Sequence, residues 1–193
     1  MKRDLCQSCQ KPLRACICQF FCSIDNQIKV IALQHPSEVN QNKGTLTLLK
    51  NSLSNIEVIE GEDFTENKRL NEVINHYKDT VCLLYPSEKS LNIENLSTSE
   101  KHKPKVIIVL DGTWKKSYKM YQLSKNLHNL PHIKLPEGCE SLYQIRKTKK
   151  DNALSTLEAT VLSLTLLENN QTKYKKLIEN FVKFNQFQLS FRP

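Results

Sequence analysis

The sequence predicts an α/β fold in which helices cover both faces of a mainly parallel β-sheet. From residue 27 onward, short apolar runs rich in β-branched residues alternate with segments of helical periodicity. The run at residues 106–110 is apolar at all five positions, which is the pattern of a strand buried on both faces. The chain has 193 residues, enough for one such domain and a small additional module.

The additional module is predicted at the N-terminus. Five of the seven cysteines fall within the first 22 residues, and an odd total argues against a disulfide framework. Residues 1–24 are too few to fold on apolar burial alone. We therefore expect them to form a metal-binding module and residues 25–193 to form the α/β domain.

The predicted metal ligands are four cysteines in a C-x2-C-x6-C-x-C pattern: Cys6, Cys9, Cys16 and Cys18. The first pair has the spacing of a thiolate knuckle, and the second pair completes a tetrahedral set. Zinc is the favoured metal, with an iron–sulfur cluster as the alternative. Cys22 is a spare that could replace one ligand, and unligated thiols are the remaining alternative. With no coordination position left open, the metal is expected to support folding.

The first half of the α/β domain is expected to contain three strands and two helices. A strand at 28–33 is followed by a polar loop at 34–38 and by a helix at 45–52 that carries several leucines. A short strand at 56–59, a helix at 68–76 and a strand at 81–85 come next. The polar stretch 89–103 is expected to be a surface excursion.

The second half starts with the strand at 106–110. A helix is expected at 117–124, a short strand at 132–135 and a basic loop at 146–152. The clearest helix spans 155–167, where Ser155 and Glu158 fit a capping box. A last helix is expected at 174–184.

Charge and hydropathy indicate the class of partner. The net charge is +8 and the isoelectric point about 9.1, which suits a polyanionic partner such as nucleic acid; a solvated lysine surface is the alternative. No apolar run approaches the roughly 20 residues of a membrane helix. The first residues lack the apolar core of a signal peptide, so we expect a cytoplasmic protein.

A candidate site follows the strand at 106–110, where the chain becomes polar with Asp111-Gly112-Thr113-Trp114. In open α/β sheets, ligands bind beyond the carboxyl ends of the strands. The carboxylate of Asp111 could accept a proton or anchor a ligand, and its alternative role is an N-cap of the next helix. Trp114 could stack on a base or face a cation, and its alternative role is a core aromatic.

Six motifs occur together in this order. They are the cysteine pattern; Leu33-Gln34-His35-Pro36-Ser37-Glu38 with Lys43-Gly44-Thr45; Leu84-Tyr85-Pro86; Leu110-Asp111-Gly112-Thr113-Trp114; Leu142-Tyr143 with Ile145-Arg146-Lys147; and Leu154-Ser155-Thr156-Leu157-Glu158-Ala159. The set resembles the DTW-domain family, the tRNA-uridine aminocarboxypropyltransferases.

The resemblance implies an activity and a fold. Such enzymes transfer the 3-amino-3-carboxypropyl group of S-adenosylmethionine to N3 of a tRNA uridine, which forms acp3U and releases 5′-methylthioadenosine. The implied fold is similar to that of SPOUT methyltransferases, in which a trefoil knot holds the cofactor. Knots are rare among protein folds.

The resemblance also assigns roles to residues. Asp111, Thr113 and Trp114 are the expected catalytic group, with Asp111 as base or as positioning group. The residues expected to hold S-adenosylmethionine lie at strand ends and at the start of the 155–167 helix, where backbone N–H groups suit an anion. They are Leu84, Tyr85, Pro86, Asp111, Gly112, Leu154, Ser155, Thr156 and Glu158. The capping box is the alternative role of Ser155 and Glu158.

Substrate tRNA is expected to meet His35 and a group of basic residues. Arg146 could pair with a carboxylate or phosphate. Lys147, Lys149 and Lys150 are expected to form a phosphate patch with three lysines near the DTW motif, Lys115, Lys116 and Lys119. The alternative is a solvated basic loop, and for His35 a loop residue satisfied by hydrogen bonds. Competing functions are an RNA methyltransferase of the same fold, an rRNA aminocarboxypropyltransferase and a non-catalytic zinc-containing RNA-binding protein.

Overall fold

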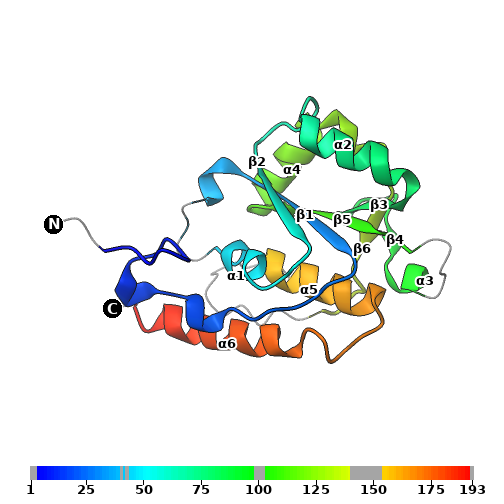
Figure 1. Cartoon of the computed structure of the whole chain (residues 1–193). Coiled ribbons are helices and arrows are strands. Elements are labelled where there is room, and N and C mark those ends of the chain that lie inside the picture. Colours follow the sequence, from blue (N-terminus) through cyan, green and yellow to red (C-terminus); the bar gives the residue numbers. More distant parts are fainter. Residues whose placement is uncertain (1–3, 40, 42–43, 98–102, 140–153, 192–193) are drawn as a thin grey trace.

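The computed structural model describes residues 4–39, 41, 44–97, 103–139 and 154–191. Its centre is a sheet of six parallel strands in the order β2-β1-β5-β3-β6-β4 (Figure 1). The strands are β1 (Lys29–Gln34), β2 (Ile56–Glu60), β3 (Val81–Leu84), β4 (Leu91–Asn92), β5 (Val106–Asp111) and β6 (His132–Lys134). The helices are α1 (Leu46–Lys50), α2 (Lys68–Tyr77), α3 (Glu94–Ser97), α4 (Trp114–Leu123), α5 (Thr156–Leu167) and α6 (Lys175–Leu189).

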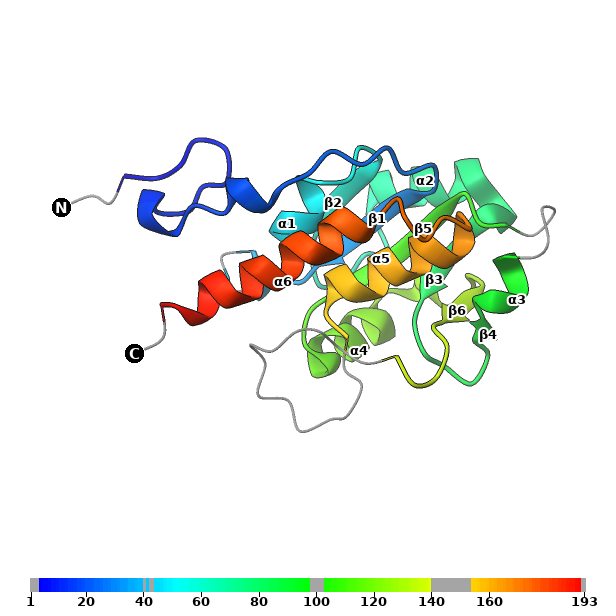
Figure 2. The same ribbon diagram turned by 90° about the horizontal axis from the view of Figure 1, so that it is seen from below.

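Helices cover both faces of the sheet, as the sequence predicts. Alternate residues of β1 point to opposite faces, so that Val30 and Ala32 join one core while Ile31 and Leu33 join the other. The first core includes side chains from α1, α5 and α6, and the second includes side chains from α2 and α4. In Figures 1 and 2, α6 runs alongside α5 on the outer side. This second layer explains why α5 carries apolar residues around most of its circumference.

Several element bounds differ from the sequence prediction, two of them by three residues or more. Helix α4 begins at Trp114, because Thr113 is its N-cap and accepts a hydrogen bond from the N–H of Lys116 at 3.4 Å. Helix α6 continues to Leu189. The polar stretch after β3 is not only a surface excursion: β4 pairs with β6, and Ile93 is fully buried. The polarity of this stretch does not predict the strand, because a single apolar residue, Ile93, is enough to join it to the core.

The N-terminal residues pack on α6. The Phe20 ring lies 6.0 Å from that of Phe184 and 5.4 Å from that of Phe187, and Asn180 Nδ2 donates a hydrogen bond to the Phe20 carbonyl at 3.1 Å. Figure 2 shows this segment reaching the same end of the molecule as the C-terminus. A division of the chain at residue 24 stays a prediction.

Within the described residues, no helix combines the length and apolarity that crossing a membrane requires.

Candidate active site and metal site

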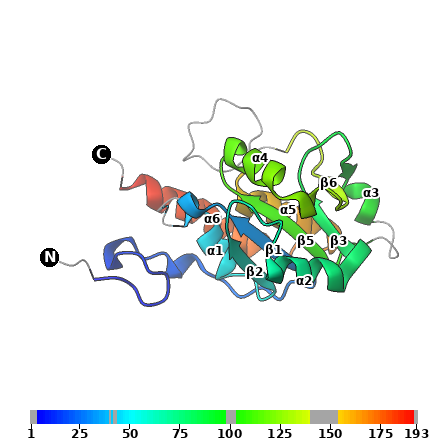
Figure 3. The same ribbon diagram turned by 90° about the horizontal axis from the view of Figure 1, so that it is seen from above.

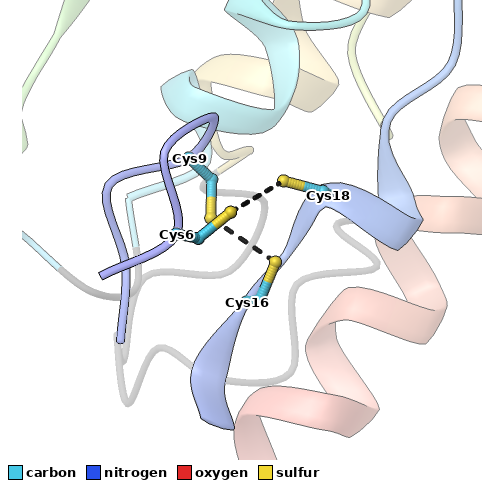
Figure 4. A group of neighbouring side chains, drawn as sticks. All are labelled: Cys6, Cys9, Cys16 and Cys18. Atoms are coloured by element: carbon cyan, nitrogen blue, oxygen red, sulfur yellow. Dashed lines mark hydrogen bonds between the residues drawn. The ribbon is translucent and has the colours of Figure 1, made fainter. Parts of the chain in front are cut away.

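The four cysteines predicted as metal ligands converge on one point. The sulfur atoms of Cys6, Cys9, Cys16 and Cys18 all lie within 4.8 Å of one another (Figure 4). Cys6 and Cys18 Sγ are 3.6 Å apart, and Cys9 and Cys16 Sγ are 3.8 Å apart. Four sulfurs at about 2.3 Å from a central zinc form a tetrahedron with edges of about 3.8 Å. The cluster therefore has the dimensions of a four-thiolate site and could hold a metal such as zinc.

Cys22 is not part of this cluster. Its sulfur is not among the four that converge, and burial raises the pKa of its thiol. In the cluster, hydrogen bonds from the backbone N–H groups of Cys9 and Ser8 lower the pKa of the Cys6 thiol to about 6, whereas burial raises the pKa of the Cys18 thiol. All four corners of the tetrahedron are cysteine sulfurs. This arrangement suits a structural role.

Asp111 is the centre of the second site. It is the last residue of β5 and is buried, with 6% of its surface exposed. Oδ2 accepts a hydrogen bond from Gln34 Nε2 at 2.9 Å, and Oδ1 accepts one from Thr156 Oγ1 at 2.7 Å. Its backbone carbonyl accepts the N–H of His35 at 3.0 Å. Asp111 thus joins the ends of β1 and β5 to the start of α5, and it is not the N-cap of α4.

The start of α5 carries the capping box that the sequence predicts. Ser155 Oγ accepts the N–H of Glu158 at 3.3 Å, and Glu158 Oε2 accepts the N–H of Ser155 at 2.8 Å. Both side chains are buried. The capping role is therefore confirmed for Ser155 and Glu158. It holds Thr156, the first residue of α5, against Asp111.

A pocket of about 670 Å³ opens at the carboxyl ends of β3, β5 and β6. Seven of the nine residues predicted to hold the cofactor line it: Leu84, Tyr85, Pro86, Gly112, Leu154, Ser155 and Thr156. Asp111 and Glu158 lie behind this lining, bonded to Thr156 and Ser155 respectively. The lining is mixed, with aliphatic side chains, aromatic rings and hydroxyl groups. Such concave, largely apolar cavities are typical of small-molecule sites.

Trp114 lines the pocket and is 48% exposed, so the core-aromatic alternative is wrong. It is the first residue of α4, placed there by the Thr113 cap. Tyr85, which follows the carboxyl end of β3, stacks on Tyr121 of α4 with ring centroids 4.5 Å apart. The pocket is therefore bordered by aromatic rings from two elements.

Gly112 lies close to side chains of α4 and of the loop after β1. A Cβ at this position would lie 3.1 Å from Lys116 Cβ and 3.7 Å from His35 Cβ. Its torsion angles do not require glycine, since it is not among the residues with positive φ. Space, and not backbone conformation, favours glycine between β5 and α4.

His35 does not line the pocket. Its Nδ1 accepts the N–H of Ser37 at 3.2 Å, which leaves the proton on Nε2, 2.9 Å from Glu62 Oε1. The loop alternative, a histidine satisfied by hydrogen bonds, describes this geometry. Its predicted contact with substrate stays a prediction.

Two of the predicted phosphate-binding lysines have acidic partners. Lys116 Nζ lies 2.7 Å from Glu38 Oε1, and Lys119 Nζ lies 2.9 Å from Glu62 Oε2. Hydrogen bonds from Lys119 and then His35 lower the pKa of the Glu62 carboxyl. Lys115 is exposed, with no ion pair among the described residues. Arg146, Lys147, Lys149 and Lys150 lie outside the described residues.

Two parts of this site are not predicted by the sequence. Gln34 belongs to the expected polar loop and to one of the six motifs but has no predicted role, whereas in the structure its side chain bonds to Asp111. The segment 135–139, which follows β6, lines the pocket together with the predicted residues. Its signal was available: Pro136 and Gly138 follow a strand, and strand ends form one edge of a parallel sheet.

Comparison with known proteins places the chain in a family. A family model described as DTW domain matches residues 3–189, nearly the whole chain. The chain belongs to the DTW-domain family. The Asp111-Gly112-Thr113-Trp114 segment thus lies within a domain that the family shares, and the structure puts it beside the pocket.

Several curated relatives of this DTW-domain chain are named tRNA-uridine aminocarboxypropyltransferases. The chain is 28% identical over 194 residues to proteins named tRNA-uridine aminocarboxypropyltransferase 2 from Macaca fascicularis, Drosophila melanogaster and Mus musculus. These alignments cover 97% of this chain, but 64% of the macaque and mouse proteins and 76% of the fly protein. A protein named tRNA-uridine aminocarboxypropyltransferase A from Arabidopsis thaliana is 27% identical over 143 residues, 64% of this chain and 52% of its own. No solved structure matches the chain.

Proposed function

We propose that this DTW-domain protein is a transferase that moves the 3-amino-3-carboxypropyl group of S-adenosylmethionine to N3 of a uridine in tRNA. The products are acp3U and 5′-methylthioadenosine. The observation that supports it most is the bond between Thr156 Oγ1 and Asp111 Oδ1, which joins two motifs 45 residues apart at the edge of one pocket. The names of the relatives give the reaction class.

The pocket fits a ligand of this kind. Its volume of about 670 Å³ is within the range of small-molecule sites, roughly 300–1,000 Å³. The first turn of α5 borders the pocket at Ser155 and Thr156, and the partial positive charge of a helix N-terminus suits the carboxylate of the methionine portion. The apolar side chains of Leu84, Val109 and Leu154 suit an adenine ring.

The residues must select one of two carbons. Both the methyl group and the methionine Cγ are activated by the same sulfonium, so only orientation separates amino-acid transfer from methyl transfer. Anchoring the carboxylate at α5 leaves Cγ between this anchor and the aromatic rim. Trp114 and Tyr85 supply that rim, where a ring face attracts the positive sulfur.

Asp111 lies behind the pocket lining, where it bonds to Thr156. Uridine N3 carries a proton that must leave when the nitrogen attacks, and a carboxylate could accept it. Both carboxylate oxygens already accept bonds from protein donors. We infer that positioning Thr156 is the main contribution of Asp111.

The basic residues Arg146, Lys147, Lys149 and Lys150 and exposed Lys115 bind tRNA phosphates, in keeping with a net charge of +8. The four-cysteine cluster holds zinc. The chain has the SPOUT-like knotted topology that the family resemblance implies, and it acts in the cytoplasm.

Two labels on S-adenosylmethionine test the function. The purified protein is incubated with tRNA and with donor labelled either in the methyl group or in the carboxyl group. We expect carboxyl label, and no methyl label, in the tRNA. Nucleoside mass spectrometry of the product then identifies acp3U and its position.

Other outcomes would identify the competing functions. Methyl label alone would make the protein an RNA methyltransferase. Carboxyl label in rRNA and not in tRNA would make it an rRNA aminocarboxypropyltransferase. Tight RNA binding with neither label would leave a zinc-containing RNA-binding protein.

A further inference from the structure

The outer face of α4 presents two exposed aromatic rings one helical turn apart. Trp114 is 48% exposed and Tyr118 is 58% exposed. Residues four apart on a helix are neighbours on its surface. Neither ring contacts another ring among the described residues, whereas Tyr121, on the inner side of the same helix, stacks on Tyr85.

This face continues from the pocket. Trp114 lines the pocket, and Tyr118 does not. Tyr118 follows one helical turn further along α4 from Trp114. Figures 1 and 3 show α4 on the opposite side of the sheet from α6. A chain entering the pocket at Trp114 would pass over Tyr118.

The charge of α4 indicates the kind of chain. The helix has three lysines and no acidic residue. Lys116 and Lys119 are held by Glu38 and Glu62, while Lys115, three residues before Tyr118, is exposed without an ion pair among the described residues. A positive charge beside exposed rings is the combination that binds unpaired nucleotides, with rings for the bases and cations for the phosphates.

We propose that Trp114 and Tyr118 form a stacking surface for the single-stranded RNA that flanks the reacting uridine, with Lys115 contacting its phosphate. This inference rests on the proposed function and makes it more specific: the substrate uridine lies in an unpaired region. Trp114 holds the base at the pocket, and Tyr118 stacks the adjacent base. Tyr118 is a positioning residue for RNA and not a catalytic residue.

Binding of a short single-stranded oligouridylate to the zinc-loaded full chain tests the proposal, with an RNA duplex of the same number of phosphates as comparison. Stacking on one aromatic ring contributes about 1–3 kcal/mol per base, so Tyr118→Ala should weaken single-strand binding by about fivefold or more. Tyr118→Phe keeps the ring and should bind within about twofold of the wild type. Binding of the duplex should be equal in all three proteins.

Trp114 is the only tryptophan in the chain, so its fluorescence reports stacking without any assay of activity. We expect the oligouridylate to quench it and the duplex to leave it unchanged. Lys115→Ala should reduce the slope of log K against log salt by about 0.7, the value for one phosphate of a single strand.

Several results would overturn the proposal. One is unchanged oligouridylate binding in Tyr118→Ala; another is an equal loss in Tyr118→Phe; a third is quenching by duplex as strong as by single strand. Concentration-dependent dimerisation that Tyr118→Ala abolishes would assign the face to a second copy of this chain. Because Tyr118 is exposed, circular dichroism of Tyr118→Ala should match the wild type.

The transfer assay separates this inference from the proposed function. If carboxyl label enters tRNA and Tyr118→Ala leaves KM for tRNA unchanged, the stacking surface is wrong and the function stands. If no label enters tRNA but single strands quench Trp114, the function is wrong and the surface stands. We expect a raised KM for tRNA together with an unchanged KM for S-adenosylmethionine.

Discussion

Asp111 illustrates how one side chain connects segments that are distant in sequence. Its two carboxylate oxygens receive hydrogen bonds from Gln34, 77 residues earlier, and from Thr156, 45 residues later. A buried carboxylate is tolerated only when donors replace its lost water. The same bonds that satisfy Asp111 therefore fix the positions of two side chains at the pocket edge.

Two substitutions at Asp111 distinguish positioning from proton transfer. Asp111→Ala should lower the transfer rate by about 100-fold or more, because it removes both hydrogen bonds and any acceptor for the N3 proton. Asp111→Asn can still accept the Thr156 hydroxyl, and rotation of the Gln34 amide by 180° would let it accept from the new amide. A positioning role predicts that Asp111→Asn keeps most activity. A base role predicts that it is as inactive as Asp111→Ala.

Single-turnover transfer and urea unfolding measure both effects. Two unsatisfied donors in Asp111→Ala should cost about 1–3 kcal/mol of stability. Near-wild-type transfer by Asp111→Ala would refute any role of this carboxylate in the reaction.

At the scale of elements, the start of α5 has two functions at once. Its capping box satisfies N–H groups that no helix can satisfy internally, and it presents Thr156 to Asp111. Helix α4 is similar, since the Thr113 cap places Trp114 at its first position beside the pocket. Both sides of the pocket are thus built on helix N-termini at the carboxyl edge of the sheet.

Ser155→Ala tests whether the α5 cap matters for activity. Loss of the cap should cost about 1 kcal/mol of stability. Because Thr156 would then be less well held, kcat/KM for transfer should also fall by about tenfold or more. Asn67 is a matched control, since its side chain caps α2 by accepting the N–H of Leu70 at 2.9 Å and does not line the pocket. Asn67→Ala should show the same loss of stability with normal transfer; equal activity in both variants would make the α5 cap purely structural.

The ion pairs of Glu57 between β2 and α2 predict that the stability of the fold depends on pH in the acid range. Arg69 donates two hydrogen bonds to Glu57, at 2.6 and 2.9 Å, and Lys29 lies 3.0 Å from the same carboxylate. Arg69 first, and then Lys29, lower the pKa of Glu57 to about 2. Since the pKa is lower in the folded chain, the stabilisation is present above the unfolded pKa of about 4.3 and is lost as the pH falls toward 2.

Glu57→Gln should therefore flatten the loss of unfolding free energy between about pH 5 and pH 2. Solvent screening at the half-exposed Arg69 keeps the difference to about 1 kcal/mol or less. Chemical denaturation at several pH values measures it. Glu72→Gln is the control, because Glu72 is 68% exposed and 3.6 Å from Arg69; an equal change in this variant would contradict the assignment to Glu57.

At the scale of the whole molecule, several contacts connect the N-terminal segment that carries the cysteine cluster to the rest of the fold. Phe20 packs on α6, and Lys11 Nζ donates to the Gln41 carbonyl at 3.2 Å in the segment between β1 and α1. A metal held by the four cysteines would tie this segment together, and we expect it to contribute to the order of the segment. Loss of the metal should then weaken the packing of α6.

Elemental analysis of purified protein should find about one zinc per chain. Cys9→Ser should lose the metal and lower the melting temperature, whereas Cys22→Ser, outside the cluster, should keep both. A chelator should reproduce the effect of Cys9→Ser in the wild type. A folded, metal-free wild-type chain with reactive thiols would show that the cluster is not a metal site.

The sequence by itself determined the features that depend on local chemistry. The strand at 106–110, the α5 capping box and the cysteine spacing are correct, because period, cap residues and ligand spacing act within a few residues. The DTW motif was located for the same reason. Its neighbours in space could not be derived in this way.

Only the tertiary structure decided which strand ends meet. The order β1-β5-β3 brings Gln34 beside Asp111 and sets Tyr85 on the same edge, and nothing in local periodicity encodes that order. It also paired Lys116 and Lys119 with acidic residues and left Trp114 and Tyr118 exposed. The physical reason is that such contacts depend on how the sheet and helices pack, which is the sum of many long-range interactions and not a property of any one segment.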